Sequence, residues 1–137
     1  MASRELSDLL PKVEQAARKA LVECQQAGLN ILITCTYRSG EEQNQLYAQG
    51  RTKPGKKVTN ARAGQSFHQW RVALDIVPLV NGKPEWSGSH PHWEQAAKIF
   101  IRNGFEWAGA WKRFKELPHF QMTGGHPLSH FQSGGKL

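Results

Sequence analysis

Cysteine is scarce in this chain, and long apolar runs are absent. The 137 residues include two cysteines, Cys24 and Cys35, and neither belongs to a CxxC pair. Both fall in segments with an apolar pattern, which favours reduced, buried thiols over a disulfide or a catalytic cysteine. A Cys-rich finger pattern is also missing. No segment approaches the roughly 20 apolar residues that a membrane-spanning helix needs.

Acidic side chains are outnumbered by basic ones. Eleven Asp and Glu residues stand against 18 Lys and Arg, which gives a formal net charge of +7. A basic surface suits polyanions, which include nucleic acids, anionic lipids and the acidic polymers of a bacterial envelope. Residues 51–65, RTKPGKKVTNARAGQ, are basic and have almost no large apolar side chain. We therefore expect a long, mobile loop there, which is either simply solvated or attracted to an anionic partner.

The N-terminal sequence MASRELSDLLPKVEQ contains acids and lacks an apolar run of signal-peptide length. We therefore expect synthesis in a cytoplasm, so that an outside target would be reached through a separate pore. The length predicts one domain over residues 1–137. The Gly-, Ser- and His-rich residues 123–137 are expected to form a loosely ordered tail.

The apolar pattern predicts about three helices and a small sheet. Helical spacing, with Pro and Gly at the ends, places helices at residues 11–27, 40–48 and 91–103. Ser39 and Glu42 are spaced as a capping box at the start of the second helix. Alternation and turn residues predict strands and a hairpin at residues 29–37, 72–80, 81–86, 105–107 and 119–122. This mixture predicts an α+β fold with a mainly antiparallel sheet.

Three residues combine metal-ligand chemistry with unusual surroundings. Asp75 interrupts the apolar strand VALDIV, where an unpaired carboxylate would be costly to bury. An arginine partner or a metal ion would each remove that cost. His68 precedes this strand, and His119 lies among apolar neighbours, where a hydrogen-bonded core histidine is the competing interpretation. Histidine and carboxylate ligands suit a catalytic zinc, which takes three protein ligands and leaves a fourth position open.

Three segments carry motifs in a fixed order. Residues 66–75, SFHQWRVALD, match the pattern SxHxxGxAxD except at Arg71. Residues 116–121, ELPHFQ, place a carboxylate three residues before a histidine that an aromatic residue and Gln follow. Residues 37–52, YRSGEEQNQLYAQGRT, match a pattern of Y-R-S, E-Q, L-Y and G-R-T. Together they resemble the zinc D-Ala-D-Ala carboxypeptidase and L-Ala-D-Glu endopeptidase family, which includes VanY-type enzymes and many phage endolysins.

The resemblance implies a role for each residue that matches a motif. It implies that His68, Asp75 and His119 are the Zn²⁺ ligands and that Glu116 is the general base. It also implies that Arg38 stabilises a carbonyl or carboxylate of the substrate. Because Pro118 disfavours a helix between Glu116 and His119, a turn or strand end must bring these two residues together.

Substrate contacts are expected from Ser66, Gln43 and Trp111. The one departure is Arg71, which stands where the pattern has Gly, a residue that often marks a positive φ or a close backbone approach. Arg71 is therefore the position at which the local turn geometry of the family is in question, although no ligand is lost. All five tryptophans could stack on sugars or bases, but Trp93 and Trp107 fit core positions better.

The prediction for function is a peptidoglycan hydrolase. We expect a monomeric phage endolysin, an antimicrobial zinc metallopeptidase that cuts the L-alanyl-D-glutamate bond of stem peptides during cell lysis. One alternative is a D-Ala-D-Ala carboxypeptidase. Another is a basic nucleic-acid-binding module with a structural zinc, which would use residues 51–62 and aromatic stacking. The last alternative is a wall binder without activity, which Glu116 and the complete ligand set disfavour.

Overall fold

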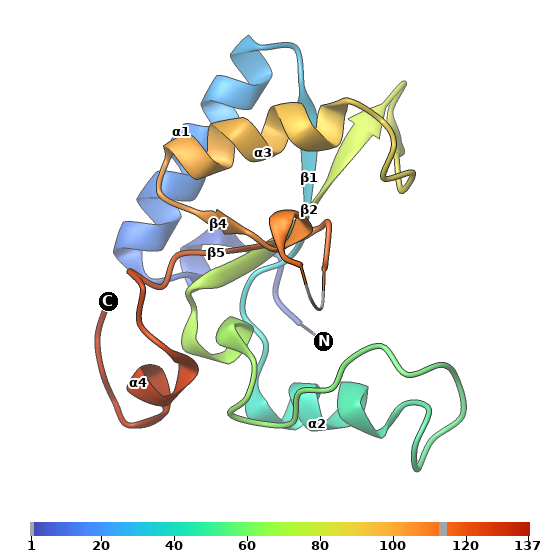
Figure 1. Ribbon diagram of the computed structural model, residues 1–137, viewed down its shortest axis with the longest axis vertical. Helices are drawn as coiled ribbons and strands as arrows, with labels where there is room; N and C mark the ends of the chain where they lie inside the picture. Colours follow the sequence, from blue (N-terminus) through green and yellow to red (C-terminus); the bar gives the residue numbers. More distant parts are fainter. Residues whose placement is uncertain (1, 113–114) are drawn as a thin grey trace.

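A five-stranded sheet organises the fold, which a computed structural model describes for residues 2–112 and 115–137 (Figure 1). Its strands pair antiparallel in the order β1-β2-β5-β4, and β3 pairs with the far end of β2. The bounds are β1 Asn30–Cys35, β2 Ala73–Val80, β3 Lys83–Pro84, β4 Glu106–Trp107 and β5 His119–Gln121. The predicted α+β class is confirmed.

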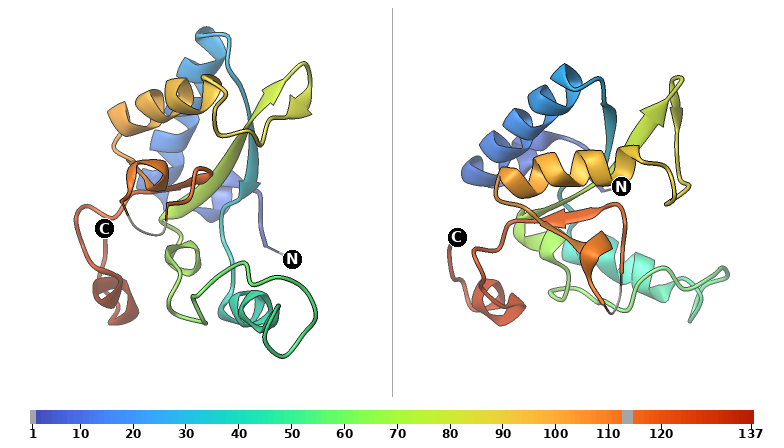
Figure 2. Two further views of the ribbon diagram at one scale, coloured as in Figure 1. Left: turned by 45° about the vertical axis from the view of Figure 1, so that its right-hand side comes forward. Right: turned by 45° about the horizontal axis from the view of Figure 1, so that its top comes forward.

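Two helices cover one face of the sheet, and a third lies apart. Helix α1 (Pro11–Gln26) and helix α3 (His92–Arg102) pack against each other and against β1 and β2. Helix α2 (Gly40–Ala48) and residues 51–65 form a separate lobe at the other end of the molecule (Figures 1 and 2). A fourth helix, α4 (Leu128–Gln132), lies near the C-terminus. No helix in the described ranges is long and apolar enough to cross a membrane.

Local sequence signals explain most element ends. Pro11 occupies the first turn of α1, and Gly28 follows the helix with φ +80°. The capping box at α2 is present as predicted: the Glu42 N–H donates to Ser39 Oγ (3.1 Å), and the Ser39 N–H donates to Glu42 Oε1 (2.9 Å). The predicted strand 29–37 is shorter in the structure, because its register slips between Ile33 and Cys35 and the chain then leaves the sheet.

Strand β2 separates the core from the opposite face of the sheet. Leu74 and Ile76 are fully buried in the apolar cluster that α1 and α3 complete. Because side chains alternate along a strand, Asp75 between them points to the other face. This alternation resolves the apparent conflict of a carboxylate within an apolar strand, since the Asp75 side chain avoids the main core.

Arg71 resolves the departure from the family pattern. It adopts the left-handed conformation that Gly favours, with φ 62° and ψ 29°. Its guanidinium lies 3.9 Å from the centre of the Tyr37 ring and donates to the Asp8 carbonyl (2.8 Å). The turn therefore keeps its glycine-like geometry, and the arginine side chain ties it to the N-terminal segment.

We expect Arg71→Ala to be less stable than Arg71→Gly. Both variants lose the contacts with Tyr37 and Asp8, but only Ala retains a β-carbon at positive φ, which costs about 1 kcal/mol. Denaturant unfolding of both variants and the wild type measures this difference. Equal stability of the two variants would show that the backbone at this position is not strained.

The C-terminal segment contains structure that its sequence did not indicate. Phe131 of α4 is buried, and its ring meets that of Phe67 edge to face at 6.0 Å. The Gln132 side chain donates to the Gly64 carbonyl (2.8 Å). These contacts join the last residues to the segment that carries His68. The expected looseness of residues 123–137 concerns their motion, and it stays a prediction.

Candidate metal centre

Three separate elements bring His68, Asp75 and His119 together. His68 lies in a short 3-10 helix (Phe67–Trp70) that Ser66 caps by accepting a hydrogen bond from the His68 N–H (3.3 Å). Asp75 lies in β2, and His119 is its paired residue on β5. Directly paired residues on antiparallel strands present their side chains on the same face. The sheet register therefore places Asp75 and His119 side by side, on the face that His68 approaches.

One oxygen of Asp75 lies between the two imidazoles. Asp75 Oδ1 is 3.1 Å from His68 Nε2 and 3.2 Å from His119 Nδ1. Zinc bonds of about 2.0–2.1 Å in a tetrahedral site put neighbouring ligand atoms about 3.3 Å apart. Both spacings from Asp75 Oδ1 are close to this value, so the carboxylate could share a zinc ion with either imidazole.

Each histidine is oriented by a second hydrogen bond on its far nitrogen. His68 Nδ1 lies 2.9 Å from the Thr36 carbonyl, and His119 Nε2 lies 2.9 Å from Gln121 Oε1. Both contacts require the far nitrogen to donate its hydrogen, so His68 Nε2 and His119 Nδ1 are the nitrogens left to bind a metal, once any proton on them is displaced. Such outer partners orient metal-binding histidines. The spacing of the motifs did not reveal that Thr36 has this role.

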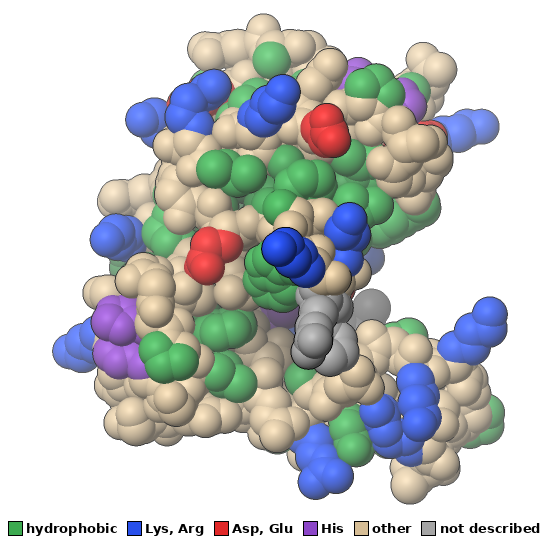
Figure 3. Space-filling view, viewed as in Figure 1, with side chains coloured by type: hydrophobic (Ala, Val, Ile, Leu, Met, Phe, Trp, Pro, Cys, Tyr) green, Lys and Arg blue, Asp and Glu red, His purple; other side chains and the backbone are tan. Residues whose placement is uncertain are grey.

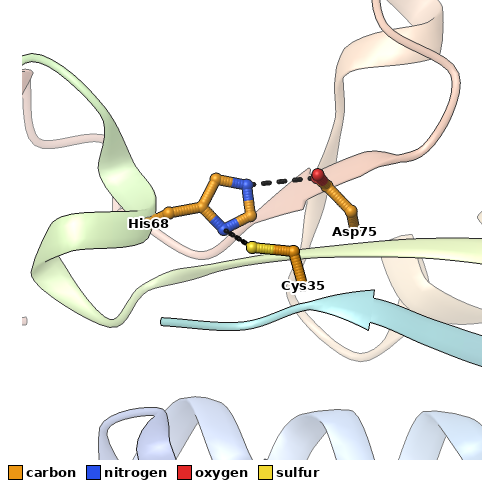
Figure 4. A group of neighbouring side chains, drawn as sticks. All are labelled: Cys35, His68 and Asp75. Atoms are coloured by element: carbon orange, nitrogen blue, oxygen red, sulfur yellow. Dashed lines mark hydrogen bonds and ion pairs between the residues drawn. The ribbon is translucent and has the colours of Figure 1, made fainter. Parts of the chain in front are cut away.

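A second possible ligand set includes the thiol of Cys35. Ligand atoms of Cys35, His68 and Asp75 all lie within 4.8 Å of one another. Cys35 Sγ is nevertheless 3.6 Å from His68 Nδ1, whereas Asp75 lies at Nε2, on the other side of the ring (Figure 4). Because the Thr36 carbonyl already occupies Nδ1, one ion cannot use both sides of this ring. The geometry favours His119 over Cys35 as the third ligand.

Electrostatic attraction couples the protonation of His68 to that of Asp75. Burial raises the pKa of Asp75, but His68 and His119 outweigh it and hold that pKa well below its usual range. Burial lowers the pKa of His68, but the Asp75 carboxylate raises it by more, to about 10. Without a metal, His68 and Asp75 therefore form an ion pair, and metal binding must displace the His68 proton.

This coupling predicts that, as the pH rises, metal-free protein becomes less stable and zinc stabilises it by a larger amount. The ion pair stabilises metal-free protein most between the ordinary pKa values of Asp, 3.8, and His, 6.5. The Asp75 contribution is lost as the pH falls, and the His68 contribution is lost as the pH rises towards about 10. We therefore expect the melting temperature of chelated protein to fall from pH 6 to pH 9. The rise in melting temperature that added zinc causes should become larger from pH 6 to pH 9. Scanning calorimetry at each pH measures both trends. A zinc-induced rise in melting temperature that is smaller at pH 9 than at pH 6 would contradict this coupling.

The three side chains open onto a cleft of about 910 Å³. Predicted site residues Arg38, Ser66, Trp111 and Glu116 also line it. Glu116 is exposed there, and Leu117 and Pro118 form a turn in which the His119 N–H donates to the Glu116 carbonyl (3.3 Å). The predicted turn is present, and it holds Glu116 beside the metal centre. The Trp111 ring lies 6.1 Å from the His119 ring.

Arg38 is fixed at two of its three nitrogens. Its Nη1 donates to Gln43 Oε1 (2.9 Å), and its Nη2 contacts Cys35 Sγ (3.4 Å). Its Nε is buried and has no acceptor within residues 2–112 and 115–137. A buried donor without a partner is costly. Arg38 is therefore oriented by its neighbours and still has guanidinium N–H groups without a described partner.

Gln43 does not lie where a substrate contact was expected. Its side chain is fully buried and is absent from the lining of the cleft. The amide binds Arg38 through Oε1 and donates from Nε2 to the Ala61 carbonyl (2.7 Å). The expectation of direct contact with substrate is therefore corrected: Gln43 links Arg38 to the basic segment 51–65.

Two imidazoles, one carboxylate, a free glutamate and an oriented guanidinium at one cleft are the parts of a metal-dependent hydrolase. Comparisons with known proteins identify the family within this class. The profile of a family described as D-alanyl-D-alanine carboxypeptidase matches residues 59–122. The chain is 39% identical over 124 residues to the peptidoglycan L-alanyl-D-glutamate endopeptidase CwlK of Bacillus subtilis. This alignment covers 85% of this chain and 74% of CwlK.

Two further similarities agree with this result. The chain is 26% identical to the L-alanyl-D-glutamate peptidase of Escherichia phage T5, with 91% of each chain covered. The fold matches the L-Ala D-Glu endopeptidase ChiX of Serratia marcescens with a TM-score of 0.66 at 23% identity, over 90% of this chain and 89% of that one. The chain therefore belongs to the zinc D-Ala-D-Ala carboxypeptidase and L-Ala-D-Glu endopeptidase family, as its motifs predicted. It is a metallopeptidase.

Proposed function

We propose that this protein hydrolyses the L-alanyl-D-glutamate bond of peptidoglycan stem peptides, with zinc held by His68, Asp75 and His119. The observation that carries this proposal is the Asp75 carboxylate between two imidazoles whose far nitrogens are both hydrogen-bonded. Relatives named as L-alanyl-D-glutamate peptidases support the choice of bond. We also propose that residues 1–137 form one peptidase domain that acts as a monomer.

The chain's own residues supply proton transfer and charge stabilisation. When bound, zinc supplies a Lewis acid and makes a water molecule more acidic. Glu116 accepts the proton of the attacking water and then delivers it to the leaving amine. The Arg38 guanidinium, which lines the cleft, donates to the substrate oxygen on which negative charge develops. Ser66 and Trp111 line the cleft and contact the peptide.

Digestion of purified peptidoglycan distinguishes this proposal from its near alternative. The protein is incubated with and without a chelator, and the new termini are identified by mass spectrometry. An endopeptidase of the proposed specificity creates new N-terminal D-Glu, whereas a D-Ala-D-Ala carboxypeptidase releases free D-Ala. Absence of cleavage in the presence of added zinc would contradict both activities.

We further propose that the protein serves in phage-type lysis, made in the host cytoplasm and released to the wall through a separate pore. The phage T5 relative supports this role. Expression of the protein alone should leave host cells intact, and co-expression of a pore-forming protein should lyse them. Lysis by the protein alone would show that it crosses the membrane without help.

We propose that the basic lobe, residues 51–62 beside α2, attracts the anionic envelope surface. Figure 3 shows Lys and Arg side chains on this lobe, across a hollow from the main body. Lys56 and Lys57 are both exposed. Binding to anionic lipid vesicles should weaken as salt rises and in Lys56→Gln/Lys57→Gln, but not in the charge-matched control Lys12→Gln/Lys98→Gln. Equal binding by both variants, or a preference for DNA over vesicles, would contradict this role.

A further inference from the structure

One end of the cleft is aromatic and has no part in the chemistry described above. Trp86 follows β3 and is 59% exposed, while Trp93 in the first turn of α3 is 2% exposed. Their ring centres lie 6.3 Å apart with planes tilted by 40°. Both residues line the same cleft as the metal centre. Ligand clefts are lined mainly by apolar and aromatic side chains, so the exposed Trp86 ring offers a contact surface for a ligand there.

This aromatic end lies close to the turn that carries Glu116. Gly88, two residues after Trp86, packs so tightly on Leu117 that a β-carbon at Gly88 would lie 2.5 Å from Leu117 Cδ1. Leu117 belongs to the turn between Glu116 and His119. The segment with Trp86 therefore borders the turn that presents the proposed base.

Trp93 adds a polar group to this surface. Its indole Nε1–H is buried and has no acceptor in the described parts of the chain. Buried donors are nearly always paired in folded proteins. An unpaired indole donor in a residue that lines the cleft indicates that a bound ligand supplies the acceptor.

The two features together specify the chemistry of the ligand. The exposed face of Trp86 suits the apolar C–H face of a sugar ring, and the Trp93 donor suits the carbonyl of an acetamido group. In peptidoglycan, the L-Ala of the stem peptide is joined through an amide to the lactyl group of N-acetylmuramic acid. The lactyl group and L-Ala therefore separate the sugar ring from the bond proposed to be cut by about two residue-lengths, roughly 7 Å of extended chain.

We propose that Trp86 and Trp93 form a subsite for the N-acetylated sugar to which the stem peptide is attached. This inference rests on the proposed function, because only a bond next to the sugar brings the glycan to this end of the cleft. The enzyme would then prefer peptides that are still attached to glycan over free peptides of the same sequence.

The preference is measured as a ratio of kcat/KM values. The two substrates are a disaccharide-linked stem peptide and the sugar-free peptide. We expect Trp86→Ala to lower the ratio about tenfold, which corresponds to about 1.4 kcal/mol. Trp86→Phe should retain most of it, and Ile101→Ala, which removes an exposed apolar side chain outside the cleft lining, should leave it unchanged. A ratio that Trp86→Ala does not lower would overturn the subsite.

Direct binding separates this inference from the proposed function. The N-acetylglucosamine–N-acetylmuramic acid disaccharide is titrated into wild-type protein while indole N–H resonances are followed by NMR. We expect saturable shifts of the Trp86 and Trp93 signals, which should vanish for Trp93 in Trp86→Ala. This result would stand even if the protein cut a different bond. Unshifted indole signals would contradict the subsite even if L-alanyl-D-glutamate cleavage were observed.

Discussion

Glu116→Gln should reduce peptidoglycan cleavage by at least about a hundredfold, the usual range for the loss of a general acid–base group. The substitution keeps the size and the hydrogen-bonding ability of the side chain but removes its capacity to accept and return a proton. Glu116 is exposed at the cleft, and among the described residues its carboxylate forms no hydrogen bond or ion pair with His68, Asp75 or His119. Zinc content should therefore remain at one ion per chain.

Measuring both activity and zinc content in Glu116→Gln distinguishes loss of the general base from loss of the metal. Glu94→Gln is the matched control, because Glu94 is exposed on α3 and lies outside the cleft lining. It should retain the activity of the wild type. Normal activity in Glu116→Gln would remove Glu116 as the base. Loss of zinc in that variant would instead assign it to metal binding.

Asp75→Asn should lose both zinc and activity. The variant keeps the shape of the side chain but removes the charge that lies between His68 Nε2 and His119 Nδ1. A neutral amide is a poor zinc ligand, so the site would keep only two good ones. We expect little bound zinc after dialysis and at least about a hundredfold less cleavage, consistent with the loss of a metal-dependent step.

The sequence offers a matched control for this charge. Asp8 is the one other aspartate in the chain, and its side chain accepts a hydrogen bond from Ser3 Oγ near the N-terminus. Asp8→Asn should keep one zinc per chain and full cleavage. Zinc content by mass spectrometry of the native protein compares the two variants. Retention of zinc by Asp75→Asn would exclude Asp75 as a ligand.

Much of the fold follows from short-range signals in the sequence. The ends of α1 and α2 depend on Pro11, Gly28 and the Ser39 box, which act within a few residues. The prominence of Asp75 within an apolar strand also pointed to the site. Strand alternation then explains why its carboxylate avoids the main core.

Other features depend on contacts that no local pattern encodes. The left-handed Arg71 is stabilised by Tyr37 and Asp8, which are distant in the sequence. The burial of Gln43 depends on how the loop returns to α2 through Ala61. Helix α4 has a Gly-rich neighbourhood, so only the packing of Phe131 reveals why it forms. These features required the three-dimensional structure.

Reconstitution of chelated protein with zinc tests the central claim most directly. Metal is removed, zinc is returned in substoichiometric steps, and release of N-terminal D-Glu from peptidoglycan is measured at each step. Cleavage should be absent without metal and should rise linearly until one zinc ion is bound per chain, with no gain in Asp75→Asn. Full cleavage by metal-free protein, or equal reactivation of Asp75→Asn, would contradict a catalytic zinc at His68, Asp75 and His119.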